Sequence, residues 1–262
     1  IYNSNVFFKN NLNEVISIIK ISNAFLFFDE KKLLNLFDLK GKIFNIPFDL
    51  KYQNVLDLKK NIEIKVPDLK LKIINEIFKV NENLSSGKNN ISILSSSINT
   101  KYNIEDQIIT FQSDVSKIYT SKIDYNGELS LMPFDLNLKI DLNNYKISNL
   151  FKLNSIINEF IKSSLLYNKN ISINVLTNIK SRIKDKIFHD AKIKFKILNG
   201  KINFDHSIFI NKNIGLIEVD NSDLFLKNDR LILTADLTLD IKDTDKLFSF
   251  LNTNKKSRKD IK

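Results

Sequence analysis

The chain has 262 residues, 43% of them hydrophobic, so it is long enough to bury a core and disorder is not expected. The net charge is +10, but 37 of the 40 basic residues are lysines that alternate with carboxylates, so nothing favours a nucleic-acid partner. Cysteine is absent, which excludes disulfides, thiolate nucleophiles and Cys-ligated metals. Weak attraction of the lysines to an anionic membrane surface stays open.

Alternation of apolar and polar residues is the main local pattern. From Met132 to Leu142 every second residue is apolar, which is typical of a strand with one apolar face. Such runs predict strands at residues 5–9, 14–28, 42–52, 61–66, 69–79, 91–94, 108–119, 128–142, 171–180, 191–197, 200–210, 214–219, 222–227 and 231–241. Turn-forming residues predict turns at 84–90, 125–128, 198–201 and 227–230.

Two segments have helical periodicity instead. Residues 147–166 place apolar side chains at helical spacing, with Asn154 or Ser155 as the N-cap. Residues 244–251 repeat this on a smaller scale, with Thr244 or Asp245 near the N-cap. We therefore expect a mainly β protein: an elongated, twisted antiparallel sheet curled into an open groove, with two short helices.

The tetrapeptide Pro-Phe-Asp-Leu occurs twice, at 47–50 and 133–136, each time with its proline six residues after a glycine. In both copies the apolar phase slips by one residue beside the proline. We interpret this as a strand bent by a bulge, because proline cannot donate a hydrogen bond to a sheet. An Ile-Ile-Asn-Glu phrase follows each copy, at 73–76 and 156–159, and a proline-free echo lies at 199–209.

The repeat predicts the organisation of the chain. Residues 1–119 form the first β unit of an extended sheet, residues 120–251 the second, and the basic residues 252–262 a loop or tail at the end of a fragment. A compact β-sandwich made by duplication is the alternative, with its apolar face buried.

Residues suited to catalysis are scarce. His189 and His206 stand in no metal-ligand spacing, and Ser85 with Lys88 forms a Ser-x-x-Lys pattern without its partner motifs. Five dispersed glycines cannot build a phosphate-binding loop. We predict that the protein is not an enzyme and has no metal or cofactor.

The order of elements between residues 120 and 251 resembles the AsmA-like C-terminal region of bacterial envelope proteins. A glycine-led strand reaching "MPFDLNLKIDL" is followed by the helical insert "LFKLNSIINEFIKSSLL" and a glycine-led meander from "NGKINFDHSIFI" to "LILTADLTLDI". The resemblance covers about half of the chain and rests on pattern rather than on a diagnostic motif.

The resemblance implies an apolar β-groove that lies across the periplasm and supports phospholipid transfer or outer-membrane assembly. The family anchors to the bacterial inner membrane through an N-terminal helix, which this sequence lacks, so we expect a periplasmic location with the anchor in a missing segment. The partners would be phospholipid acyl chains. The family offers no catalytic residues to match.

Nine apolar residues around the two repeats are the predicted lining of the groove: Phe44, Ile46, Phe48, Leu50, Met132, Phe134, Leu136, Leu138 and Ile140. An aliphatic and aromatic face without converging polar groups suits acyl chains of any shape. A structural or protein-binding β-scaffold with a closed hydrophobic core is the alternative function, and each of these residues would then be ordinary core.

Overall fold

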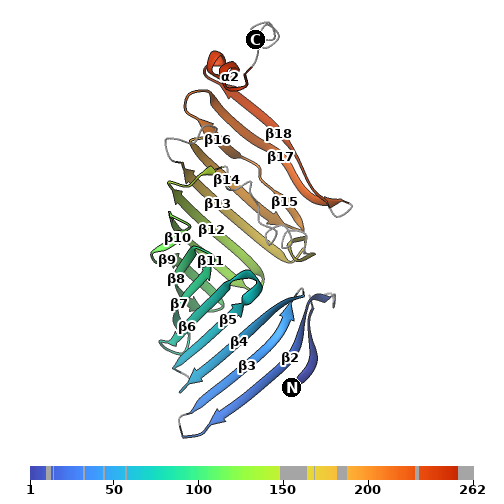
Figure 1. The fold of residues 1–262 in the computed structure, drawn as a ribbon, viewed down its shortest axis with the longest axis vertical. Coiled ribbons are helices and arrows are strands. Elements are labelled where there is room, and N and C mark those ends of the chain that lie inside the picture. The colour runs from blue at the N-terminus through green and yellow to red at the C-terminus, as the bar shows by residue number, and fades with distance from the viewer. Residues whose placement is uncertain are drawn as a thin grey trace.

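The computed structural model describes residues 1–9, 13, 15–31, 33–43, 45–56, 58–147, 164–167, 169–181, 188–227 and 230–252. These residues form one 18-stranded sheet, elongated and strongly twisted (Figure 1). Its strands are β1 (Tyr2–Lys9), β2 (Val15–Asp29), β3 (Leu34–Ile43), β4 (Ile46–Val55), β5 (Lys59–Val66), β6 (Leu71–Lys79), β7 (Leu84–Ile93), β8 (Ser96–Glu105), β9 (Ile108–Ser113), β10 (Ser116–Ile118), β11 (Ser121–Leu131), β12 (Phe134–Asn143), β13 (Ile171–Lys180), β14 (Asp190–Leu198), β15 (Lys201–Asn203), β16 (Ser207–Asn211), β17 (Gly215–Lys227) and β18 (Arg230–Ile241).

Neighbours in the chain are neighbours in the sheet almost throughout, as short hairpin connections require. In two positions of the sheet, two short strands lie end to end where one long strand would stand. The pair β9 and β10 lies between β8 and β11, and the pair β15 and β16 lies between β14 and β17. The predicted mainly β fold is thereby confirmed. The sheet is mixed rather than wholly antiparallel, because β12 and β13 run parallel. The predicted boundary at residue 120 falls between β10 and β11, and the sheet continues across it; the division into two units stays a prediction.

Both Pro-Phe-Asp-Leu segments lie beside hairpin turns. Leu131 at the end of β11 pairs directly with Phe134 at the start of β12, and Ile43 of β3 pairs with Ile46 of β4 in the same way. Each turn therefore has two residues. The prediction of single bulged strands at 42–52 and 128–142 is wrong, because the chain reverses direction at these points.

A two-residue hairpin explains the slip in apolar phase. In both hairpins the sequence numbers of two cross-strand partners sum to an odd value. Because such partners lie on the same face of the sheet, odd-numbered residues of the first strand share a face with even-numbered residues of the second. Leu129 pairs with Leu136, and Gly127 with Leu138. A one-residue slip therefore indicates either a bulge or a reversal, and the partner strand decides between them.

Four predicted turns have mixed outcomes. Asn199 and Gly200, both with positive φ, connect β14 to β15, and β17 turns into β18 where predicted, since Lys227 pairs with Arg230. The turns predicted at 84–90 and 125–128 are wrong, because both segments lie within strands.

Aromatic packing explains why those two strands carry glycine. A Cβ atom on Gly87 would overlap the ring of Tyr102 on the adjacent β8. On Gly127 it would overlap the ring of Phe111 and the backbone oxygen of Asn137. Each glycine makes room for an aromatic ring on the same face of the sheet, a packing arrangement that suits strands rather than turns.

The two helix predictions have different outcomes. Helix α2 (Thr244–Phe250) confirms the second. Its N-cap is Asp243 rather than the predicted Thr244 or Asp245, and Asp243 Oδ1 accepts a hydrogen bond from the Lys246 backbone N–H at 3.0 Å. Most of the first, 147–166, lies outside the described residues, as do Asn154 and Ser155; only the 3₁₀ helix η3 (Ser164–Tyr167) is described near its end. A second 3₁₀ turn, η1 (Pro67–Leu69), joins β5 to β6.

Two apolar clusters are closed, both on the C-terminal half of the sheet. In one, Tyr145 and Ile147 pack over Ile123, Leu142 and Ile179; in the other, Leu166 of η3 covers Ile197 and Ile202. Besides packing on β14 and β15, η3 also lies against β2. The sheet therefore curls back on itself with this apolar face inside, bringing the upper end of β2 towards the C-terminal half (Figure 1).

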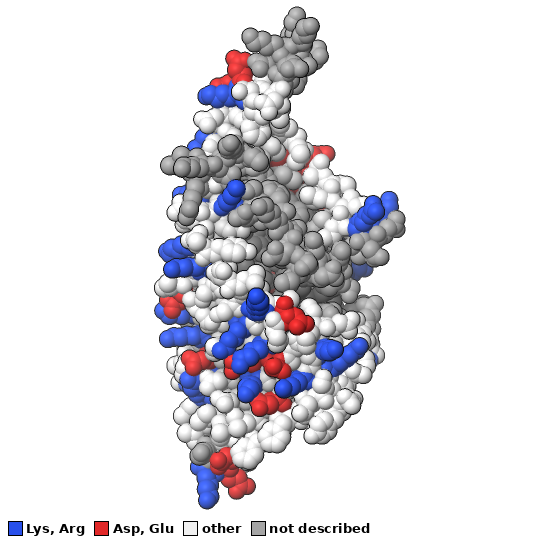
Figure 2. Space-filling model, viewed as in Figure 1, with Lys and Arg blue, Asp and Glu red and all other residues white. Residues whose placement is uncertain are grey.

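Charges of both signs are mixed on the surface of the middle strands (Figure 2). Lys65 of β5 and Lys72 of β6 are direct cross-strand partners, and Glu63 lies 3.1 Å from both ammonium groups. The contacts with Lys72 and then Lys65 hold the pKa of Glu63 below its ordinary value. This carboxylate therefore relieves a repulsion between like charges within the sheet.

Replacement Glu63→Gln is expected to lower the free energy of unfolding at neutral pH by less than about 1 kcal/mol, since the group is partly exposed. Because the folded-state pKa is depressed, the stabilisation is present above the ordinary carboxyl pKa and is lost as the pH falls through the folded value. Urea midpoints of the two proteins, measured from neutral pH downwards, should converge in acid. A difference that persists unchanged at low pH would contradict this account.

Candidate functional site

One face of the sheet is mainly apolar. On β1 to β4, the cross-strand register places Val6, Ile19, Ile43, Ile46 and Leu50 on this face. It continues through the partners Leu129, Leu136, Ile173, Ile197 and Ile202, and through Leu224 to Leu233 on the last strand. Residues of the first four strands and of strands β11 to β18 thus contribute to this face.

The predicted lining residues fall on this face in two groups. Ile46, Phe48 and Leu50 lie together on β4, and Phe134, Leu136, Leu138 and Ile140 lie together on β12, with β5 to β11 between the groups. Met132 is in the turn before β12 and is 80% exposed. Phe44 lies outside the described residues.

The degree of cover varies along the face. Phe48, Leu50, Leu136 and Leu138 are half-buried. On β18 the apolar side chains Leu233, Leu237 and Leu239 are more than half exposed. The chain as a whole exposes 17672 Å², whereas a compact monomer of this size exposes about 12,000 Å². Among the described residues, the buried apolar clusters are confined to the C-terminal half.

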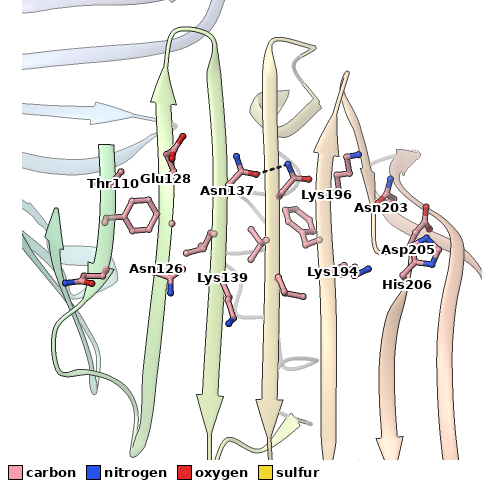
Figure 3. A pocket seen from close by; sticks show the side chains of 18 of the residues that line it. Thr110, Asn126, Glu128, Asn137, Lys139, Lys194, Lys196, Asn203, Asp205 and His206 are labelled. Carbon is pink, nitrogen blue, oxygen red and sulfur yellow. Dashed lines mark hydrogen bonds between the residues drawn. The ribbon is translucent and has the colours of Figure 1, made fainter. Parts of the chain in front are cut away.

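The opposite face carries a hollow of about 910 Å³ across β8, β9 and β11 to β15 (Figure 3). Its two walls are cross-strand rows of mainly polar side chains: Thr110, Glu128, Asn137, Asn174, Lys196 and Asn203 in one, and Gln112, Asn126, Lys139, Leu176 and Lys194 in the other. Within the first row, the Asn174 side-chain amide donates to Asn137 Oδ1 at 3.1 Å. This polar trough therefore lies on the face of the sheet opposite the apolar face.

Sequence reasoning did not find the polar trough, because side chains from seven different strands contribute to it. The alternating run Lys192, Lys194 and Lys196 on β14 was its one local signal. At the end of the trough, Asp205 accepts hydrogen bonds from Ser222 of β17, and His206 lies close to two carboxylates of the same strand. The interruption between β15 and β16 places them there.

The Ser-x-x-Lys pattern does not form a pair. Ser85 and Lys88 lie three residues apart on β7, so their side chains point to opposite faces of the strand.

No described helix is long and apolar enough to cross a membrane.

Comparison with known proteins gives no match: no family model fits the chain, and neither a curated protein nor a solved structure is significantly similar to it.

Proposed function

We propose that the protein holds phospholipid acyl chains along the apolar inside of its curled sheet. It would do so as a non-enzymatic part of the bacterial cell envelope, in lipid transfer between membranes or in outer-membrane assembly. The observation that carries the proposal is the mainly apolar face that extends from Val6 on β1 to Leu233 on β18, half-buried at Leu50 and Leu136 and exposed at Leu233. The periplasmic location and the inner-membrane anchor rest on the AsmA-like resemblance alone.

The chemistry of the face suits acyl chains. Each methylene group moved from water to an apolar surface contributes about 0.8 kcal/mol, without requiring a directional contact. Isoleucine, leucine and phenylalanine side chains on successive strands can therefore accept a chain at many positions. A mainly apolar face allows an acyl chain to move across the strands with little contact with water.

The closed clusters favour a second candidate, a structural or protein-binding scaffold. Where η3 covers Ile197 and Ile202, the apolar face is core and cannot admit a ligand. If similar cover extended over the rest of the face, the sheet would be a support for other proteins. Such a scaffold carries no stoichiometric phospholipid.

Site-specific photo-crosslinking separates these candidates. A photoreactive residue at Phe134 or Leu136 is expected to give lipid adducts, detected by mass spectrometry, in protein purified from bacterial cells. Asn137 is the matched control, because it is exposed on the opposite face of the same strand. Absence of adducts at Phe134 and Leu136, or equal adducts at Asn137, would reject acyl binding on this face.

A further inference from the structure

Two irregular segments face each other at the end of the polar trough. Strand β15 stops at Asn203 and β16 resumes at Ser207, while the neighbouring β17 has a bulge between Asp220 and Asp223. His206 and Asn221 both have positive φ, at 61° and 47°. Such residues are uncommon outside glycine and stay in place only where their surroundings fix them.

Hydrogen bonds between the two segments fix this arrangement. Oδ1 of Asp205 accepts from both the backbone N–H and the hydroxyl of Ser222, each at 2.7 Å. The Ser222 Oγ in turn accepts from the Phe204 backbone N–H at 2.6 Å, and the His206 N–H donates to the Val219 carbonyl at 2.7 Å. Ser222 is buried, so the imidazole of His206 is carried on a rigid support.

The imidazole lies beside two carboxylates of β17. His206 Nδ1 is 2.9 Å from Asp220 Oδ1 and 3.9 Å from Glu218 Oε1, and one ligand atom from each residue lies within 4.8 Å of the others. Ligand atoms bound tetrahedrally to one zinc ion at about 2.0–2.2 Å are separated from each other by about 3.3–3.6 Å. Small side-chain rotations therefore bring all three atoms onto a common ion.

One of these atoms lacks a hydrogen-bond donor. Asp220 Oδ1 is inaccessible to solvent and receives no hydrogen bond of acceptable geometry from the described residues, although His206 Nδ1 is close. A buried carboxylate oxygen without a donor is costly, and a cation removes the cost. The other nearby carboxylates are engaged elsewhere: Asp205 with Ser222, and Asp236 with the Asn221 side-chain amide at 2.7 Å.

We propose that His206, Glu218 and Asp220 bind a divalent transition-metal ion, with Zn²⁺ as the probe. One imidazole nitrogen and two carboxylate oxygens are a ligand set that zinc accepts, and three protein ligands leave a position for water. His206 also lines the polar trough, so the site would adjoin that hollow. The ion would join the β15–β16 interruption to β17. This site is independent of acyl binding on the other face.

The chain offers a direct test, because it contains no cysteine and only two histidines. Calorimetric titration of chelator-treated protein with Zn²⁺ is expected to show one saturable site. His206→Asn, chosen because asparagine tolerates the left-handed backbone, should weaken binding by about tenfold or more. His189→Gln should leave binding unchanged. Saturable binding that survives His206→Asn, or no saturable binding in the unsubstituted chain, would overturn the proposal.

Two further measurements guard against loss of the fold as the cause. Glu218→Gln keeps a regular strand residue and should weaken Zn²⁺ binding while circular dichroism stays unchanged. Co²⁺ should broaden the imidazole NMR signals of His206 and spare those of His189, whose Nδ1 accepts from the Lys212 backbone N–H at 2.9 Å. Equal broadening of both histidines would contradict a site at His206.

Discussion

Replacement Ile197→Asp is expected to unfold the C-terminal half of the sheet. Ile197 is fully buried between Leu166 of η3 and Ile202 of β15. A large-to-small change at such a position costs about 2–5 kcal/mol, and the buried carboxylate adds to this cost. Because whole domains are stable by about 5–15 kcal/mol, the cooperative unfolding transition of this part should be lost or displaced to much lower urea concentration.

The neighbouring residue supplies the control. Leu198 follows Ile197 in β14 but points to the other face, where it is 43% exposed. Leu198→Asp should therefore change the free energy of unfolding by no more than about 0.5 kcal/mol. Urea unfolding followed by far-UV circular dichroism compares the two. Equal stability of both variants would show that η3 does not close the apolar face.

The second large effect is expected for Gly127→Ala. The added Cβ would overlap the backbone oxygen of Asn137 on β12 as well as the ring of Phe111 on β9. A backbone atom held in a ladder cannot rotate away, so β11 and β12 must separate. Overpacking of this kind costs about 1–3 kcal/mol, and the displaced strand hydrogen bonds add to it.

Gly87→Ala is the matched comparison, because the three atoms nearest to its Cβ would all belong to the side chain of Tyr102. The double variant Gly87→Ala with Tyr102→Ala should recover much of the loss caused by the alanine at 87. Adding Phe111→Ala to Gly127→Ala should recover little, since the clash with the Asn137 backbone remains. Thermal unfolding of these four variants and of the single variants Tyr102→Ala and Phe111→Ala measures both couplings. Full recovery in the second pair would contradict the backbone clash.

Much of the local structure follows from alternation in the sequence. The period of two from Met132 to Leu142 places β12 correctly, and the runs at 171–180 and 231–241 match β13 and β18 closely. Strands with weaker alternation were missed: β3 and β8 were not predicted, and β7 was predicted only at its end. These segments mix polar residues into the apolar face, such as Asn35 and Thr100.

One dipeptide shows where local reasoning fails. Asn-Gly occurs at 126–127 and at 199–200, and turn chemistry predicts a hairpin at both. Only the second is a turn; the first lies in mid-strand, where Gly127 accommodates Phe111. The residues that decide between these outcomes come from a different strand.

The sequence by itself determined that the protein is built from strands with one apolar face, because side-chain alternation is a property of the extended backbone at each residue. Only the tertiary structure decided that the two Pro-Phe-Asp-Leu segments begin new strands, that β12 and β13 run parallel, and that His206 meets Asp220. These features depend on pairing between distant segments, whose register follows from packing over the whole sheet.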